Sequence, residues 1–269
     1  NGLIIWYSKP IESNAITGLT GLFNNANYAG SWLNIIWPFA LSSIFIENSY
    51  KKKFISFIFI IFIALCIVLT NSRAAWLGLF FSIPILFGVK GFKWIIFISA
   101  IFSFVISFLY LSSFNSIIPT QIISNFQNLN FPRIDIWQKA IDSIISNPFF
   151  GKGAASFPDI YQLSGGEWKG HAHNLVIELM FNYGIPAALL VVLPILLITI
   201  LAYKKKLLNV YETQKVSFDK AIVSSLIILI MMHLVDITYL DGRISIIGWI
   251  LLAASRKIID EENIPKRWS

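Results

Sequence analysis

The chain has 269 residues, of which 56% are hydrophobic and 15% aromatic, whereas only 13% are charged. Its mean hydropathy is +0.70. So apolar a composition excludes an ordinary soluble domain and places the chain in a lipid bilayer. The net charge of +7 does not indicate a nucleic-acid partner, because most basic residues fall in loops between apolar segments.

Seven apolar segments are long enough, or nearly long enough, to cross a bilayer. A helix needs about 20 mostly apolar residues to span the hydrocarbon, and none of the segments shows the period-2 alternation of a barrel strand. We therefore predict an all-α, polytopic membrane protein with about seven transmembrane helices in a single membrane domain. The segments are 28–46, 54–70, 74–89, 94–111, 175–202, 221–240 and 244–254.

Lys and Arg are distributed unevenly over the connecting loops. One set of alternate loops holds Lys51, Lys52, Lys53, Lys90, Lys93, Lys204, Lys205, Lys206, Lys215, Lys220, Arg256, Lys257, Lys266 and Arg267. The other set holds only Lys9, Arg73, Arg133, Lys139, Lys152, Lys169 and Arg243. Because cytoplasmic loops are enriched in basic residues, we predict that 1–27 and 112–172 lie outside and that 255–269 is a cytoplasmic tail. Since the chain opens in an outside segment, we expect further helices upstream.

The outside loop contains an amphipathic helix, predicted over 133–147. Pro132 precedes the helix, and the pair Asn147-Pro148 ends it. Its apolar stripe is Ile134, Trp137, Ile141, Ile144 and Ile145, opposite Asp135, Gln138, Lys139 and Asp142. Such a helix is expected to lie flat at the level of the lipid headgroups.

Two arginines of the outside face are candidates for binding an anion. Arg133 falls in the first turn of the predicted helix, beside backbone N–H groups that attract negative charge. Arg73 follows a two-residue connection between spans, which holds its guanidinium at the membrane boundary. The alternative for both is an interfacial residue that only contacts lipid phosphate.

The stretch KGHAHNLVIELMF places two histidines directly before an apolar run. Asn174 is a good helix N-cap, and the positive end of the helix dipole keeps a nearby imidazole neutral. His173 is therefore a candidate general base, although a purely structural hydrogen bond is the alternative. A zinc site with His171 would need ligands from Asp159, Glu167 or Glu178, which show no zinc-binding spacing, and we predict no metal.

A third histidine, His233, stands close to Asp236 within the predicted span 221–240. This pair could relay protons or make a contact between helices, and we favour the contact.

Four segments resemble the superfamily of O-antigen ligases and O-antigen polymerases. They are GLFNNANYAGSWLNIIWPFAL, NSRAAW, RIDIWQKAIDSIISNPFFGKGAASF and HNLVIELMFNYGIPA, which together cover 21–187. The resemblance implies a GT-C-like, metal-independent, inverting glycosyltransferase without a cofactor. Such an enzyme moves a glycan from undecaprenyl diphosphate to a hydroxyl of lipid A-core or another saccharide, at the periplasmic face of the bacterial inner membrane.

The resemblance also implies roles for individual residues. Arg73 and Arg133 would hold the diphosphate, and His173 would take the proton of the acceptor. Substrate contacts are assigned to Asn27, Trp137, His171, Asn174 and Arg243. Polymerisation of an O-antigen or capsule, transport of bicarbonate and a structural role in an envelope complex remain alternatives.

Overall fold

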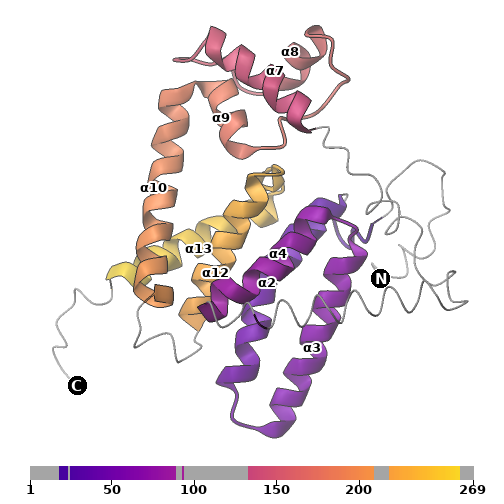
Figure 1. Ribbon diagram of the computed structural model, residues 1–269, viewed down its shortest axis with the longest axis vertical. Coiled ribbons are helices and arrows are strands. Elements are labelled where there is room, and N and C mark those ends of the chain that lie inside the picture. The colour runs from indigo at the N-terminus through magenta and orange to yellow at the C-terminus, as the bar shows by residue number, and fades with distance from the viewer. Residues whose placement is uncertain (1–17, 24, 89–92, 94–132, 209–217, 261–269) are drawn as a thin grey trace, which may run out of the picture. The chain divides into compact units, whose positions relative to one another are not determined.

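The structure is a computed structural model that describes residues 18–23, 25–88, 93, 133–208 and 218–260. All regular elements in these ranges are helices (Figure 1), which confirms the all-α class for this part of the chain. The predicted span 94–111, most of the N-terminal segment 1–27, the first part of the outside loop and the end of the cytoplasmic tail lie outside the described residues.

Three described helices are long and apolar enough to cross a membrane: α2 (Ala26–Ile46), α3 (Tyr50–Leu69) and α10 (Ile185–Tyr203), whose span continues through a π-helical turn to Leu208. Helix α4 (Arg73–Phe87) is apolar but shorter. The prediction of seven spans is thus supported for three of them by length and composition.

The chain divides into two compact units. In the first unit, α2 packs against both α3 and α4. Small residues permit this close packing: a side chain at Gly78 would lie 2.9 Å from the amide of Asn34. Asn34 Nδ2 donates to Ala75 O at 3.0 Å, and Trp37 Nε1 donates to Ser82 Oγ at 2.7 Å. Interhelical hydrogen bonds of this kind hold helices together where lipid supplies no hydrophobic driving force.

The second unit contains α7 (Arg133–Ser146), α8 (Phe157–Leu163), α9 (Leu175–Tyr183), α10, a 3₁₀ turn η3 (Thr238–Leu240) and α13 (Gly242–Asp260). Helix α12 (Phe218–His233) is divided between the two units. Helices α7, α8 and α9 gather at the N-terminal end of α10 (Figure 1). Their shared core consists of Ile136, Ala140, Ile144, Phe157, Tyr161, Ala172 and Phe181.

The predicted continuous helix 175–202 is wrong, because the chain breaks at Gly184 between α9 and α10. Gly184 has φ +84°, and a Cβ on it would lie 2.2 Å from the carbonyl oxygen of Phe149. Only glycine tolerates both the positive φ and this close backbone contact. The break therefore seats the turn after α7 directly on the start of α10.

Candidate active site

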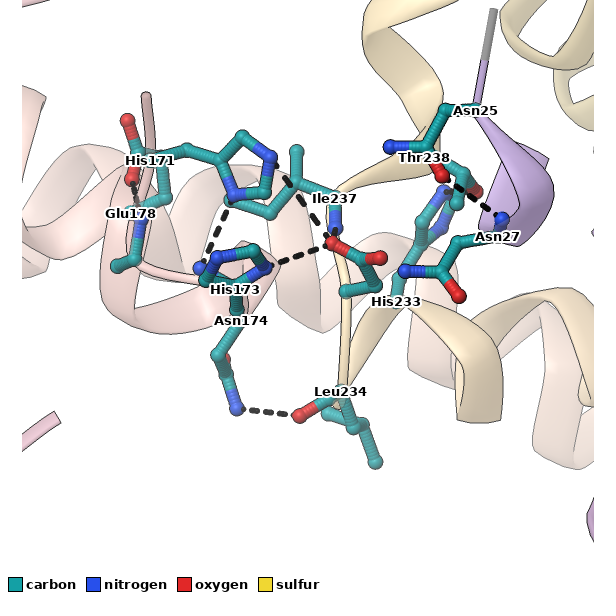
Figure 2. Close-up of polar contacts among 12 residues, drawn as sticks. Asn25, Asn27, His171, His173, Asn174, Glu178, His233, Leu234, Ile237 and Thr238 are labelled. Carbon is teal, nitrogen blue, oxygen red and sulfur yellow. Dashed lines mark hydrogen bonds and ion pairs between the residues drawn. The ribbon is translucent and has the colours of Figure 1, made fainter. Parts of the chain in front are cut away.

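The polar centre of the second unit is formed by the loop His171–Asn174 and the N-terminal part of α9, which follows it (Figure 2). Asn174 is the N-cap of α9, as predicted: its Oδ1 accepts from the N–H groups of Val176 and Ile177 at 3.0 and 3.1 Å. Its Nδ2 donates to Leu234 O at 2.9 Å. Since both ends of the amide are engaged, Asn174 joins the loop to the segment that follows α12.

Ala172, between the two histidines, is held by a side chain on each of its backbone groups. Its N–H donates to Glu178 Oε2 at 2.8 Å, and its carbonyl accepts from Trp137 Nε1 at 2.9 Å. Its own side chain is fully buried. Trp137, predicted to contact substrate, therefore uses its indole N–H to fix the loop.

The Ala172 contacts restrict the backbone on either side. His173 has φ +53°, a left-handed conformation that non-glycine residues rarely adopt. Such a strained conformation persists only where several contacts hold it in place, and residues of this kind cluster at functional sites. Here Glu178, Trp137 and the N-cap Asn174 supply that constraint.

His173 is paired with Asp236. The distance from His173 Nδ1 to Asp236 Oδ1 is 3.0 Å, and the same oxygen accepts from the backbone N–H of Ile237 at 2.8 Å. Because a carboxylate can only accept hydrogen bonds, the proton of neutral His173 belongs on Nδ1. The lone pair of Nε2 is then available to another group, and the side chain is 26% exposed. This arrangement is that of a base oriented by an acid.

His171 stacks edge-on against His173, with ring centroids 4.2 Å apart. Its Nδ1 accepts from the backbone N–H of His173 at 3.2 Å, so its own proton belongs on Nε2. Burial, followed by the neighbouring His173 and Arg133, lowers the pKa of His171 to about 4, although Asp236 opposes this shift. His171 is therefore a neutral ring that shapes the site near pH 7.

Arg133 is the first residue of α7, as predicted, and its charge acts on His171. Arg243 forms a two-point ion pair with Asp241, with Nε–Oδ1 at 3.0 Å and Nη2–Oδ2 at 2.6 Å. The hydrogen bonds from Arg243 lower the pKa of the partly buried Asp241 carboxyl. A substrate anion at Arg243 would have to compete with that carboxylate.

Arg73 and Asn27 lie in the first unit. Arg73 is exposed and begins α4, where Ser72 is the N-cap and accepts from Ala75 N at 3.4 Å. Asn27 lies in the first turn of α2, and its backbone N–H is capped by Asn25 Oδ1 at 2.8 Å. Both residues thus stand at helix N-termini, where backbone N–H groups favour anions.

A metal could be considered at His171, His173 and Asp236, whose potential ligand atoms lie within 4.8 Å of one another. Two imidazoles and a carboxylate are a donor set that zinc accepts. The third member is Asp236, not the Asp159, Glu167 or Glu178 that the sequence suggested. However, His171 Nδ1 and His173 Nδ1 already make the hydrogen bonds described above, which fit an oriented base.

Sequence reasoning missed two residues of this site. It paired Asp236 with His233, whereas His233 Nε2 lies 3.2 Å from Thr238 Oγ1 and Asp236 pairs with His173. It considered Glu178 as a possible zinc ligand. The available signal was an acid within an apolar helix, since a buried carboxylate requires partners.

A family model described as O-antigen ligase matches residues 57–192, about half of the chain. The chain belongs to the O-antigen ligase family. The family is of the membrane glycosyltransferase type and falls in the O-antigen ligase and polymerase superfamily. The matched range includes Arg73, Arg133 and His173 but ends before Asp236. A comparison with curated proteins finds no match.

Proposed function

We propose that the protein transfers a glycan from undecaprenyl diphosphate to a hydroxyl acceptor at the periplasmic face of the bacterial inner membrane. The observation that carries the proposal is the contact of 3.0 Å between His173 Nδ1 and Asp236 Oδ1. It gives the loop an imidazole whose second nitrogen can accept a proton, beside a cationic arginine. Family membership supports the class of reaction.

In the proposed step, His173 Nε2 takes the proton of the acceptor hydroxyl while its oxygen attacks the anomeric carbon. The bond from that carbon to the diphosphate oxygen breaks, and undecaprenyl diphosphate leaves with the electron pair. A single displacement of this kind inverts the anomeric configuration. Asp236 stabilises the imidazolium that forms, as an acid partner does in other oriented bases.

Arg133 and Arg73 are proposed to bind the diphosphate as it departs. A guanidinium binds phosphate oxygens with two parallel hydrogen bonds and remains charged at every physiological pH. Two such groups supply the charge stabilisation for which many transferases use a divalent cation.

A strain that lacks the gene, complemented with the full-length gene carrying His173→Ala, tests the proposal. We expect loss of polymer-capped lipopolysaccharide on a gel at unchanged protein abundance, because the acceptor is no longer deprotonated. Glu167→Gln, an exposed acid in the preceding loop, is the matched control and should preserve the banding. Unchanged banding in His173→Ala at equal abundance would contradict a catalytic role.

The acceptor distinguishes ligation from polymerisation. Without a ligase, polymer accumulates on the lipid carrier and lipid A-core stays uncapped. Without a polymerase, lipid A-core carries a single repeat unit. The banding of the deletion strain separates the two, and we propose ligation as the first reading because the matched family model describes a ligase.

A further inference from the structure

Helix α7 has an apolar surface that is wider than the core it covers. Ile136, Ala140 and Ile144 are buried against α8 and α9. A second stripe, Ile134, Ile141 and Ile145, is 57%, 46% and 69% exposed. The sequence grouped Ile144 with this second stripe. The structure separates the two: Ile144 is buried in the core shared with α8 and α9, whereas Ile145 is mostly exposed.

The exposed stripe continues beyond the end of α7. Phe149, four residues after Ile145, is 70% exposed, and Phe150 is 90% exposed. Large apolar side chains that gather on a surface in this way mark a contact with a protein or a membrane. The exposed polar residues Asp135, Asp142 and Ser146 lie about 100° around the helix axis from this stripe. The apolar stripe therefore has a polar flank on the side away from the core.

The turn that carries Phe149 and Phe150 is fixed to the start of α10. Ile185 N donates to Pro148 O at 2.7 Å, and Lys152 N donates to Phe181 O at 2.8 Å. Gly151, with φ +67°, packs so closely that a Cβ would lie 2.6 Å from the backbone of Asn182. The two phenylalanines therefore keep a set height relative to the N-terminal end of α10.

That end of α10 places the turn at the boundary of the bilayer. The span Ile185–Leu208 has a mean hydropathy of 2.8 over its best window, of which 17% is buried within the protein. Leu190 and Leu193, close to its start, are 78% and 57% exposed. By length and composition this helix is a candidate membrane span, and in a bilayer its exposed apolar side chains would face lipid. The exposed surface of α7 and its turn is thus continuous with a lipid-facing helix.

We propose that Ile141, Ile145, Phe149 and Phe150 form a membrane-anchoring surface that inserts into the leaflet at the N-terminal end of α10. Its occupant is the headgroup and upper acyl-chain region of the surrounding bilayer. Apolar helices lie in this region with their polar face toward water. Asp135, Asp142 and Ser146 then face the aqueous phase.

The anchoring surface also sets the height of the candidate active site, a consequence that rests on the proposed function. Trp137 of α7 holds the histidine loop through Ala172, and Arg133 begins the same helix. A lipid-linked diphosphate stays at headgroup level, because its polyprenyl chain remains in the hydrocarbon. Anchoring α7 in the interface brings the base and the arginine to that level.

Spin labels on the full-length protein in lipid nanodiscs test the anchoring surface. Cys66 is replaced by Ala, and single labels are placed through Ile141→Cys, Ile145→Cys or Phe150→Cys, with Asp135→Cys, Asp142→Cys and Ser146→Cys as controls on the same element. Relaxation is measured with oxygen, which partitions into the bilayer, and with a water-soluble nickel chelate. We expect oxygen to dominate at the first three positions and nickel at the controls.

Nickel dominance at positions 145 and 150 would overturn the proposal, as would protection from both reagents, which would indicate that protein covers the surface. A second measurement replaces Phe149 and Phe150 together by Ser and compares KM for the polyprenyl donor with KM for a short-chain, water-soluble donor. We expect KM to rise only for the polyprenyl donor. Labels that report insertion in a protein that transfers no glycan would uphold the surface and refute the proposed function.

Discussion

Hydrogen bonds serve different purposes in the two units. The first unit uses them in its polar interior, and the second unit uses them in the histidine loop. In the first, Asn34 and Trp37 join α2 to α4 through groups that do not ionise near neutral pH. In the second, Glu178, Trp137 and Asn174 hold a loop that presents an imidazole. Polar contacts thus fix helices in one region and orient a proton acceptor in the other.

The largest expected effect comes from Asp236→Asn, which removes the negative charge beside His173 but nearly preserves the side-chain shape. We expect glycan transfer in nanodiscs to fall by about 10²- to 10⁴-fold, the range that a general base contributes. Asp159→Asn, an exposed acid on α8, is the control. If Asp236→Asn transferred glycan at the wild-type rate, the role of Asp236 in orienting His173 as a base would be contradicted.

Glu178→Ala should loosen the loop itself. It leaves the N–H of Ala172 and the amide of Asn182 without their acceptor, at a cost of about 1–3 kcal/mol for buried groups. We expect faster hydrogen exchange at the Ala172 amide and a smaller loss of transfer than in Asp236→Asn. Glu178→Gln, which retains one acceptor oxygen, should restore part of the protection. Unchanged exchange in Glu178→Ala would show that the loop is held by other contacts.

Asn34→Ala tests the structural role of the hydrogen bonds in the first unit. Loss of its bonds to Ala75 and Gly30 should lower the free energy of unfolding by about 1 kcal/mol. Because Asn34 serves helix packing, transfer per folded molecule should be preserved. Thermal unfolding in detergent and transfer in nanodiscs measure the two quantities separately. A loss of transfer as large as that of Asp236→Asn would contradict the division of roles.

A pH dependence of stability is expected from His171. Its pKa in the folded protein, about 4, lies below the ordinary value of 6.5. Protonation therefore favours unfolding. The contribution of neutral His171 to the free energy of unfolding is fully present above the ordinary pKa and is lost as the pH falls toward 4. We expect the melting temperature to fall between about pH 7 and pH 5, and to fall less in His171→Gln. Equal slopes in both proteins would contradict this assignment.

Local signals in the sequence predicted α7 and the cap of α9 closely. The expected helix 133–147 is found as Arg133–Ser146, since proline and the Asn-Pro pair act on the adjacent backbone. Asn174 caps α9 because its short amide reaches the next free N–H groups. Both features depend on residues within one helical turn, which is why the sequence alone was sufficient.

The break at Gly184 and the division of the α7 stripe were not predictable in this way. Asn182, Gly184 and Pro186 interrupt the apolar run only briefly, and the carbonyl of Phe149, which packs against Gly184, shows why the chain turns there. Likewise, Ile144 and Ile145 are both apolar, but α8 and α9 cover only one of them. Each outcome depends on a segment remote in sequence.

The sequence by itself determined the membrane class, the helices marked by local caps and the candidates His173, Arg133 and Arg73, because composition and short-range backbone chemistry are written in consecutive residues. Only the tertiary structure decided that Asp236 pairs with His173, that Glu178 and Trp137 hold Ala172 between them and that the described residues leave one side of α7 exposed. These contacts join side chains from different segments, and their partners are chosen by packing, not by spacing along the chain.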